Sequence, residues 1–215
     1  MISKKDVKGE TMENEKIEKN KELFTQLLIR TGRNGIEKVL EGLENLGFFK
    51  APASSRFHLA EEGGLLQHSL NVYEQAMHIR AVQVKMFPEL ENRLWTESIA
   101  IAALLHDVCK AEVYKQVEKF RKDKDNRWEK YLAYENYQSH CPLGHGEKSV
   151  IRLLQMGLGL TEDEIYAIRW HMSAWDLSDY RDSRDCFDKA CDKCPLLSII
   201  VSADWLATRI TEKFQ

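Results

Sequence analysis

The feature that most constrains this chain is an apolar run that ends in two costly polar residues. The stretch "WTESIAIAALLHDVCK", residues 95–110, is nearly all apolar up to Leu105 and then places His106 beside Asp107. A run of this kind favours a helix covered on all sides, and therefore a central one. A buried carboxylate is costly unless something pairs with it. The run therefore predicts either an ordinary helix end or a cation site inside a helical core.

Size and charge narrow the class of protein. The chain has 215 residues, 43% of them hydrophobic and 30% charged, which suits one soluble globular domain. It carries 31 Lys and Arg against 34 Asp and Glu, which predicts no general affinity for nucleic acid or membranes but leaves room for a local basic groove. No apolar run reaches the roughly 18 residues of a membrane span, and no secretory signal opens the chain. Five cysteines without a regular framework indicate reduced thiols and a cytoplasmic location.

Helical spacing of apolar residues recurs through most of the chain. Residues 1–15 are polar and aperiodic and predict a disordered start, which leaves 16–215 as a single domain. Thr161 and Glu164 form the pattern of a capping box. The polar, aspartate-rich residues 173–193 predict a loop. The expected helices cover 17–31, 36–47, 65–87, 95–110, 144–157, 161–172 and 194–214.

One segment departs from the helical pattern. Aromatic and β-branched residues in "VYKQVEKF" and "RWEKYLAYENY" flank the polar turn "RKDKDN". This arrangement predicts a β-hairpin around residues 113–137. The fold class is therefore an all-α helical bundle with a small inserted hairpin.

Several expected helices send a histidine or an aspartate toward the apolar face. Taken singly, each has an ordinary explanation, because an inward histidine is more often a hydrogen-bonded core residue than a ligand, and an aspartate can pair with an arginine. Taken together, they would place several polar groups in an apolar core, which costs free energy unless these groups share a cation. Imidazole with carboxylate suits Mn, Fe, Co, Ni or Zn as divalent ions. The residues in question are His68, His106, Asp107, His145, His171 and Asp204.

These residues also carry a family resemblance. The segments "GGLLQHSLNV", "AALLHDVCK", "GHGEKSV", "RWHM" and "SADWLAT" occur in the order H…HD…H…H…D. This order resembles the HD-domain superfamily of metal-dependent phosphohydrolases. It is most similar to the HD domain at the C-terminal end of bacterial 3′→5′ exoribonucleases, over about residues 48–207. Unlike those enzymes, the chain shows no nucleic-acid-binding barrel before this region, so the hairpin either substitutes for the barrel or shapes a pocket for a smaller substrate.

The resemblance implies a site for one or two metal ions. By position, His68, His106, Asp107 and Asp204 match the ligands of the first metal, and His145 and His171 match the extra histidines of members with two. Lys110 matches the lysine that meets substrate phosphate.

The chemistry that such a set supports is the attack of a metal-activated water on phosphorus. Asp107 is the residue expected to hold or deprotonate the water, and Lys110 the one to neutralise phosphate charge. His58 and Arg169 are further candidates for binding substrate, although Arg169 is equally well explained as a surface helix residue. His140 competes with His145 as a ligand, and the motif favours His145.

Three cysteines, Cys186, Cys191 and Cys194, together with Cys141, raise the alternative of a structural zinc site. Nothing in their spacing fixes a fourth ligand, so free thiols are the simpler interpretation.

Three functions remain open on the sequence. The first is a phosphohydrolase, either a phosphodiesterase or a phosphomonoesterase, that acts on a small nucleotide or a short nucleic-acid end. The second is an HD module that holds metal and senses a nucleotide without turnover. The third is an all-α scaffold whose histidines are satisfied in the core. Degenerate members lose ligands, whereas all six positions are kept here, which favours the enzyme.

Overall fold

The computed structural model describes residues 4–137, 142–177 and 181–214, and these residues are mostly helical. Short 3₁₀ turns η1 (Phe48–Lys50), η2 (Pro88–Asn92), η3 (Val108–Glu112) and η4 (Ser173–Asp176) and a π-helical turn η5 (Ala207–Thr211) join the longer elements. The strands are β1 (Tyr114–Lys122) and β2 (Trp128–Asn136). The α-helices are α1 (Lys4–Arg30), α2 (Ile36–Leu46), α3 (Gly64–Met86), α4 (Thr96–Leu105), α5 (His145–Gln155), α6 (Glu162–Trp170), α7 (Arg181–Lys193), α8 (Pro195–Leu206) and α9 (Glu212–Phe214).

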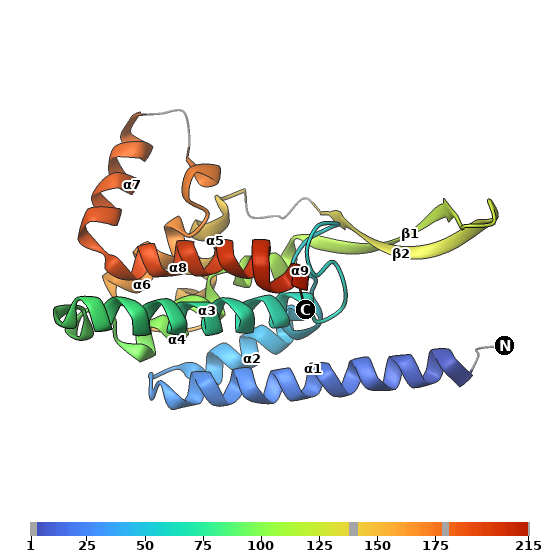
Figure 1. Cartoon of the computed structure of the whole chain (residues 1–215), viewed down its shortest axis with the longest axis horizontal. Coiled ribbons are helices and arrows are strands. Elements are labelled where there is room, and N and C mark those ends of the chain that lie inside the picture. Colours follow the sequence, from blue (N-terminus) through green and yellow to red (C-terminus); the bar gives the residue numbers. More distant parts are fainter. Residues whose placement is uncertain (1–3, 138–141, 178–180, 215) are drawn as a thin grey trace.

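The long helices form a layered bundle around α4. Figure 1 shows α1, α3 and α8 running along the long axis of the molecule in successive layers. Helix α4 packs against α1, α3, α6 and α8. Every side chain from Ile99 to Leu105 is buried, because α4 has core on all sides. The sequence prediction of a central apolar helix is confirmed, although α4 ends at Leu105, just before the histidine and aspartate.

Local signals end the helices where the sequence places them. Gly47 adopts φ 73°, a left-handed conformation that costs little without a Cβ, and its N–H closes the end of α2. Pro88 follows α3 by two residues. The Thr161 side chain accepts a hydrogen bond from the Glu164 N–H at the start of α6, and the Glu164 carboxylate accepts one from the Thr161 N–H, so the capping box is confirmed.

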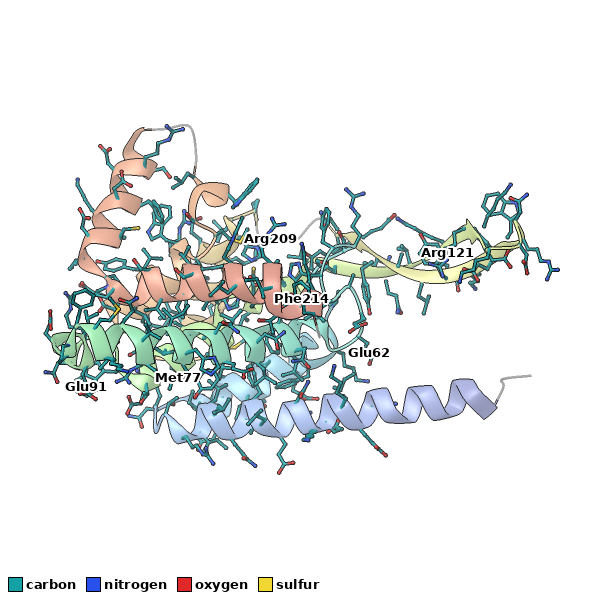
Figure 2. All side chains as sticks on the ribbon, viewed as in Figure 1. Glu62, Met77, Glu91, Arg121, Arg209 and Phe214 are labelled. Atoms are coloured by element: carbon teal, nitrogen blue, oxygen red, sulfur yellow. The ribbon has the colours of Figure 1, made fainter. Side chains whose placement is uncertain are left out.

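The predicted hairpin is also confirmed. Strands β1 and β2 pair antiparallel, with Tyr114 opposite Asn136 at the base and Lys122 opposite Trp128 near the tip. The hairpin projects from one end of the bundle (Figure 1). Figure 2 shows Arg121 out on this arm, well away from the helices.

The prediction of a loop over residues 173–193 is wrong for its second half, which forms α7. The spacing of Phe187, Ala190, Cys191 and Cys194 is helical, and these residues pack toward the core, with the Phe187 ring 5.7 Å from that of Trp170. These four apolar residues form a short stripe, and two of them are cysteines. The many aspartates around them therefore made the segment read as a polar loop.

At the other end of the chain, α1 begins inside residues 1–15, whose disorder in solution stays a prediction. Within the described residues, no single helix is long and apolar enough to cross a membrane; α7 and α8 would meet that test only as a pair bent by 103°.

Candidate metal centre

Five elements bring the six predicted ligands to one buried point. His68 lies on α3, His106 and Asp107 follow α4, His145 opens α5, His171 follows the end of α6, and Asp204 lies on α8. The exposed fractions of His68, His106, Asp107 and His171 are all 2% or less. The side chains of His145 and Asp204 are 23% and 21% exposed, so the cluster reaches solvent on their side.

Asp107 is the hub of the cluster. Its Oδ1 lies 2.5 Å from His145 Nε2 and 3.3 Å from His171 Nε2. Its Oδ2 lies 3.3 Å from His106 Nε2 and 3.5 Å from His68 Nε2. One carboxylate thus faces four imidazole nitrogens, two on each oxygen, which is the arrangement of a group that bridges two neighbouring positions.

The remaining ligands complete one of those positions. His68 Nε2 lies 3.3 Å from both Asp204 Oδ1 and His106 Nε2. Ligand atoms of His68, His106 and Asp204 lie within 4.8 Å of one another, as do those of His106, Asp107 and His171. These two groups could each hold a metal ion and share His106. A third such group among the described residues, His58 with His68 and Glu212, shares His68 with the first.

Contacts on the far side of three histidine rings orient them. His106 Nδ1 lies 2.8 Å from the Ala103 carbonyl, and His171 Nδ1 lies 2.7 Å from the Ile168 carbonyl, each one turn earlier in the chain. Each Nδ1–H donates to its carbonyl, which fixes the tautomer and points Nε2 at the centre. His171 Nε2 is buried and makes no hydrogen bond among the described residues.

A glycine lets two of the ligand elements approach closely. A Cβ on Gly146 would lie 2.2 Å from the Arg169 carbonyl and 2.6 Å from the Ile168 carbonyl. Any larger residue would push the start of α5 away from the end of α6. Gly146 therefore sets the separation between His145, which precedes it, and His171, which hydrogen-bonds the same Ile168 carbonyl.

Sequence reasoning missed one important residue, Glu212. Its Oε1 lies 2.7 Å from His68 Nδ1 and accepts a hydrogen bond from the Asn71 amide at 3.3 Å. The Glu212 carboxylate is fully buried. A carboxylate that accepts from the outer nitrogen of a metal-ligating histidine orients the ring and makes it a stronger ligand. Glu212 thus does for His68 what main-chain carbonyls do for His106 and His171.

The π turn η5 explains both why Glu212 reaches His68 and why the sequence concealed it. In an unbroken α-helix, Asp204 and Glu212 would lie about 80° apart around the axis. A π turn accommodates one extra residue, which moves later residues back by about 100° and leaves the two carboxylates about 20° apart. The only sequence signal was a second carboxylate two turns after Asp204.

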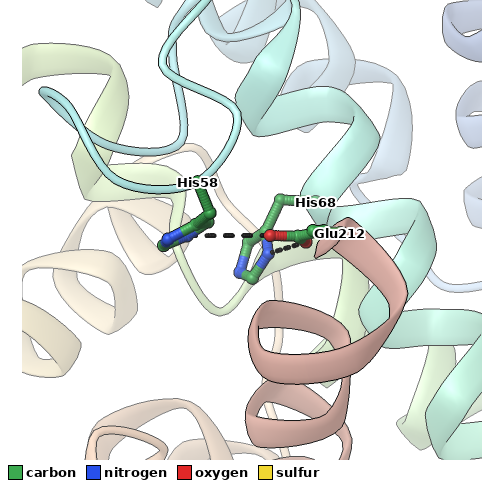
Figure 3. Close-up of side chains that lie close together, drawn as sticks. All are labelled: His58, His68 and Glu212. Carbon is green, nitrogen blue, oxygen red and sulfur yellow. Dashed lines mark hydrogen bonds and ion pairs between the residues drawn. The ribbon is translucent and has the colours of Figure 1, made fainter. Parts of the chain in front are cut away.

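His58 covers the cluster from a loop. Figure 3 shows the His58 ring, from the loop before α3, and the Glu212 carboxylate, from the end of the chain, on either side of His68. His58 Nε2 lies 4.0 Å from Glu212 Oε2, and both atoms are buried without a hydrogen bond among the described residues. Burial, helped by the nearby charge of His68, lowers the pKa of His58 to about 4.

Charges within the cluster move the pKa values of its members away from those that burial alone would give. Burial alone would raise the pKa of Asp107, but the charge of Lys110 and neighbouring imidazoles outweigh it and hold the pKa well below the usual range. Burial would lower the pKa of His145, yet the Asp107 charge raises it to about 9. His68 likewise has a raised pKa, since its hydrogen bonds to the carboxylates of Asp107 and Asp204 outweigh its burial. Protons on His68 and His145 thus supply the positive charge that metal ions would supply.

The ligand types and their geometry fit divalent transition metals. Imidazole and carboxylate groups are the ligands such ions accept, and the Nε2 atoms of His106 and His171 point at the centre while their Nδ1 atoms contact main-chain carbonyls. The residues present can therefore hold one or two such ions.

The predicted substrate-binding residues lie at different places. Lys110 Nζ lies 2.5 Å from Asp107 Oδ2, inside the cluster. Burial opposes its charge, but Asp107 and Asp204 hold the pKa of Lys110 above its ordinary value. Arg169 pairs with Glu147 at 2.7 Å and stacks on the Trp170 ring at 3.9 Å. A role for Arg169 in phosphate binding stays a prediction.

The competing metal ligands fall outside the cluster or the described residues. His140 and Cys141 lie in the segment that the structure does not describe. Cys186, Cys191 and Cys194 are free thiols, and no candidate metal group among the described residues contains a cysteine.

Comparison with known proteins gives one match. Residues 36–137 match the family model TraI_2, described as "Putative helicase". The match covers less than half of the chain and includes His68, His106, Asp107 and Lys110, but ends before His145. No curated protein and no solved structure matches the chain.

Proposed function

We propose that this chain is an HD-type metal-dependent phosphohydrolase that cleaves a phosphoester of a nucleotide or of a nucleic-acid end. The observation that carries the proposal is the convergence of four imidazole Nε2 atoms on the two oxygens of Asp107. A core whose histidines were merely satisfied would not aim four of them at one carboxylate, because each would be stabilised by any single acceptor.

The chain's own residues supply positions and charge for the reaction. When bound, one or two divalent ions supply Lewis-acid polarisation of a phosphoryl oxygen and acidification of a water. Asp107 holds the attacking water or takes its proton, since it is the carboxylate at the centre of the cluster. Lys110 keeps its positive charge beside Asp107 and neutralises charge on the equatorial phosphate oxygens. His58 is neutral near pH 7 and stays a candidate for contact with substrate.

The comparisons support a nucleic-acid end over a free nucleotide. The matched family model is described as a helicase, and helicases act on nucleic acid strands. The matched residues include the doublet His106–Asp107 and Lys110, and also the hairpin that follows them. A substrate that touches both the centre and the hairpin would need to be longer than a mononucleotide.

The first test is metal content and metal-dependent hydrolysis. Purified protein is expected to bind close to one or two equivalents of Mn²⁺, Co²⁺, Ni²⁺, Fe²⁺ or Zn²⁺. It should then hydrolyse at least one member of a panel of aryl phosphodiesters, nucleotides and short oligonucleotides. Asp107→Ala should abolish both metal binding and hydrolysis, because it removes the central ligand. Asp188→Ala, a change at an exposed site on α7, is the matched control.

Two results would contradict the proposal in different ways. Failure to bind any of these metals would mean that the histidines are structural. Stoichiometric metal without hydrolysis of any panel member would instead assign the chain to the sensing modules that hold metal and nucleotide without turnover.

A further inference from the structure

One face of the hairpin exposes three large apolar side chains. The residues at even positions share this face, because side chains alternate along each strand and cross-strand partners lie on the same side. Phe120, Trp128 and Leu132 all belong to it and are 66%, 70% and 59% exposed. Phe120 is the diagonal neighbour of both others, since its direct partner Lys130 lies between them on β2.

The opposite face is covered by contacts within the hairpin. Arg121 pairs with Glu129 at 2.6 Å and lies 4.9 Å from the centre of the Tyr131 ring. Lys119 pairs with Glu135 at 2.8 Å. The even face also has internal contacts, since Lys130 pairs with Glu118 and Lys122 lies near the Trp128 ring, yet Phe120, Trp128 and Leu132 stay more than half exposed. A two-stranded hairpin that projects alone is marginally stable. Clustered exposed apolar groups on such an arm indicate a binding surface.

The charge of the hairpin favours a nucleic acid as the partner of its even face. Residues 114–136 contain seven Lys and Arg against five Asp and Glu, whereas the whole chain has an acidic excess. A lysine lies directly opposite the two aromatic rings nearest the tip of the even face: Lys122 opposite Trp128, and Lys130, which also pairs with Glu118, opposite Phe120. Lys122 Nζ lies 5.7 Å from the centre of the Trp128 ring and forms no ion pair among the described residues. Rings alternating with ammonium groups suit bases alternating with phosphates.

The spacing of the rings favours a single strand over a duplex. Diagonal neighbours on paired strands, such as Phe120 and Trp128, are separated by about 7–8 Å. Stacked bases in a duplex rise about 3.4 Å per nucleotide, so a ring can enter between bases only where the strand is extended to about twice that spacing. An unpaired strand can extend in this way, whereas a base-paired duplex resists it.

The arm is continuous with the candidate metal centre. Turn η3, which holds Lys110, leads directly into β1, and the Tyr137 N–H donates to the Val113 carbonyl at 2.6 Å to close the base of the hairpin. A strand lying along the even face from Trp128 toward Tyr114 would therefore run about 27 Å and end near Lys110.

We propose that the even face of the hairpin binds single-stranded nucleic acid, with bases stacked on Trp128 and Phe120 and phosphates beside Lys122 and Lys130. The proposal rests on the proposed function in one respect: the bound strand would lead its end to the metal centre. The surface itself needs neither metal nor turnover.

The test is oligonucleotide binding by fluorescence anisotropy in EDTA, with the full chain. The probes are labelled dT12, rU12 and a 12-base-pair DNA duplex. The wild-type protein should bind a single-stranded probe more tightly than the duplex, and the dT12 and rU12 arms show whether DNA or RNA is preferred. Trp128→Ala and Phe120→Ala should each weaken this binding by about 5- to 150-fold. Lys122→Ala should reduce the dependence of log Kd on log salt by about 0.7.

Matched variants test the same residue types elsewhere on the surface. Trp205 on α8 is 54% exposed, and Trp205→Ala should leave the affinity unchanged. Lys189→Ala on α7 should leave the salt dependence unchanged. Circular dichroism of each variant confirms that the fold is intact.

Three results would overturn the proposal. One is tighter binding of the duplex than of both single-stranded probes. Another is wild-type affinity in the Phe120→Ala, Trp128→Ala double variant. The third is a concentration-dependent dimer in sedimentation that the double variant abolishes, which would assign the face to a second copy of the chain.

The two proposals fail separately. Binding that persists while no phosphoester is cleaved contradicts only the proposed function. Cleavage of small phosphodiesters without hairpin-dependent binding contradicts only the proposal for the hairpin.

Discussion

At the residue scale, the groups that contact Nδ1 of each histidine matter as much for the centre as the groups that face its Nε2. His68, His106 and His171 each have an acceptor on Nδ1, and their Nε2 atoms face inward as a consequence. The acceptor for His68 is the only charged one of the three, the Glu212 carboxylate. Glu212 should therefore matter for metal affinity although it does not face the metal position.

Substitution of Glu212 tests this directly. Glu212→Ala should weaken metal binding by about 10- to 100-fold, because His68 loses both its orientation and its added basicity. Glu212→Gln keeps an acceptor without the charge and should fall between Ala and wild type. Isothermal titration with Mn²⁺ measures the effect, and Glu41→Gln at an exposed position of α2 is the control. Wild-type affinity in Glu212→Ala would show that the contact is only structural.

Metal binding should also expel protons. The pKa of His145 is about 9 in the metal-free protein, because the Asp107 charge outweighs burial, and that of His68 is also raised. Near pH 7.5 the His145 ring is therefore protonated, and a metal ion must displace that proton. Apparent affinity should rise with pH up to about 9. Titrations in buffers of different ionisation enthalpy measure the protons released; none released would contradict the assignment.

The same shift affects the stability of the metal-free protein. His145 has a pKa above its unfolded value near 6.5, so its contribution to the free energy of unfolding is fully present below pH 6.5 and is lost as pH rises through about 9.

At the element scale, the centre depends on how helices end and on where one of them widens. His106 and His171 lie at helix C-termini, His145 lies at a helix N-terminus, and Glu212 follows the π turn η5. Helix ends allow neighbouring residues to point at a common place, which the regular surface of a helix does not allow. The π turn also brings side chains together, because its extra residue rotates Glu212 about the helix axis relative to Asp204.

Deletion of residues from η5 tests this phase change. Removal of Arg209, which is exposed, takes out the extra residue and should convert the π turn to α-helix. Glu212 would then still lie about 20° from Asp204 around the axis, so metal affinity should stay close to that of the wild type. Removal of Arg209 and Ile210 together should rotate Glu212 by about 100° away from His68 and lower metal affinity by about 10- to 100-fold, as for Glu212→Ala. Equal loss in both deletion variants would mean that the length of the segment, and not the phase, is responsible.

At the scale of the whole molecule, the centre joins segments from across the chain. Ligands come from α3, the segment after α4, α5, the end of α6 and α8, so a bound ion connects elements whose positions are otherwise fixed only by packing. An ion that binds the folded state alone stabilises it in proportion to the logarithm of its concentration over Kd.

Metal should therefore raise the melting temperature substantially. At 1,000 times Kd, the gain is about 4 kcal/mol, or roughly 8–16 °C for a chain of this size. Differential scanning fluorimetry with Mn²⁺, Co²⁺, Ni²⁺ or Zn²⁺ measures the shift, and EDTA should reverse it. Asp107→Ala should show no shift. A wild-type protein indifferent to all four ions would contradict a metal centre.

The sequence by itself determined the helical class, the central helix, the hairpin and the identity of the six clustered side chains. The first three follow from local periodicity and local caps. The six side chains follow from the cost of polar groups on apolar faces together with the resemblance to the HD-domain superfamily, which favoured His145 over His140. Helix α7 was missed because its apolar stripe is short and rich in cysteine. Glu212 was missed because its direction depends on a π turn, which has no reliable sequence signal.

Only the tertiary structure decided that Asp107 lies at the hub and that Glu212 supports His68. It also decided that Gly146 lets α5 and α6 meet. The physical reason is that these facts depend on distances between segments far apart in the chain. Periodicity tells which face of a helix is buried, but only the packing of helix against helix tells which buried groups meet.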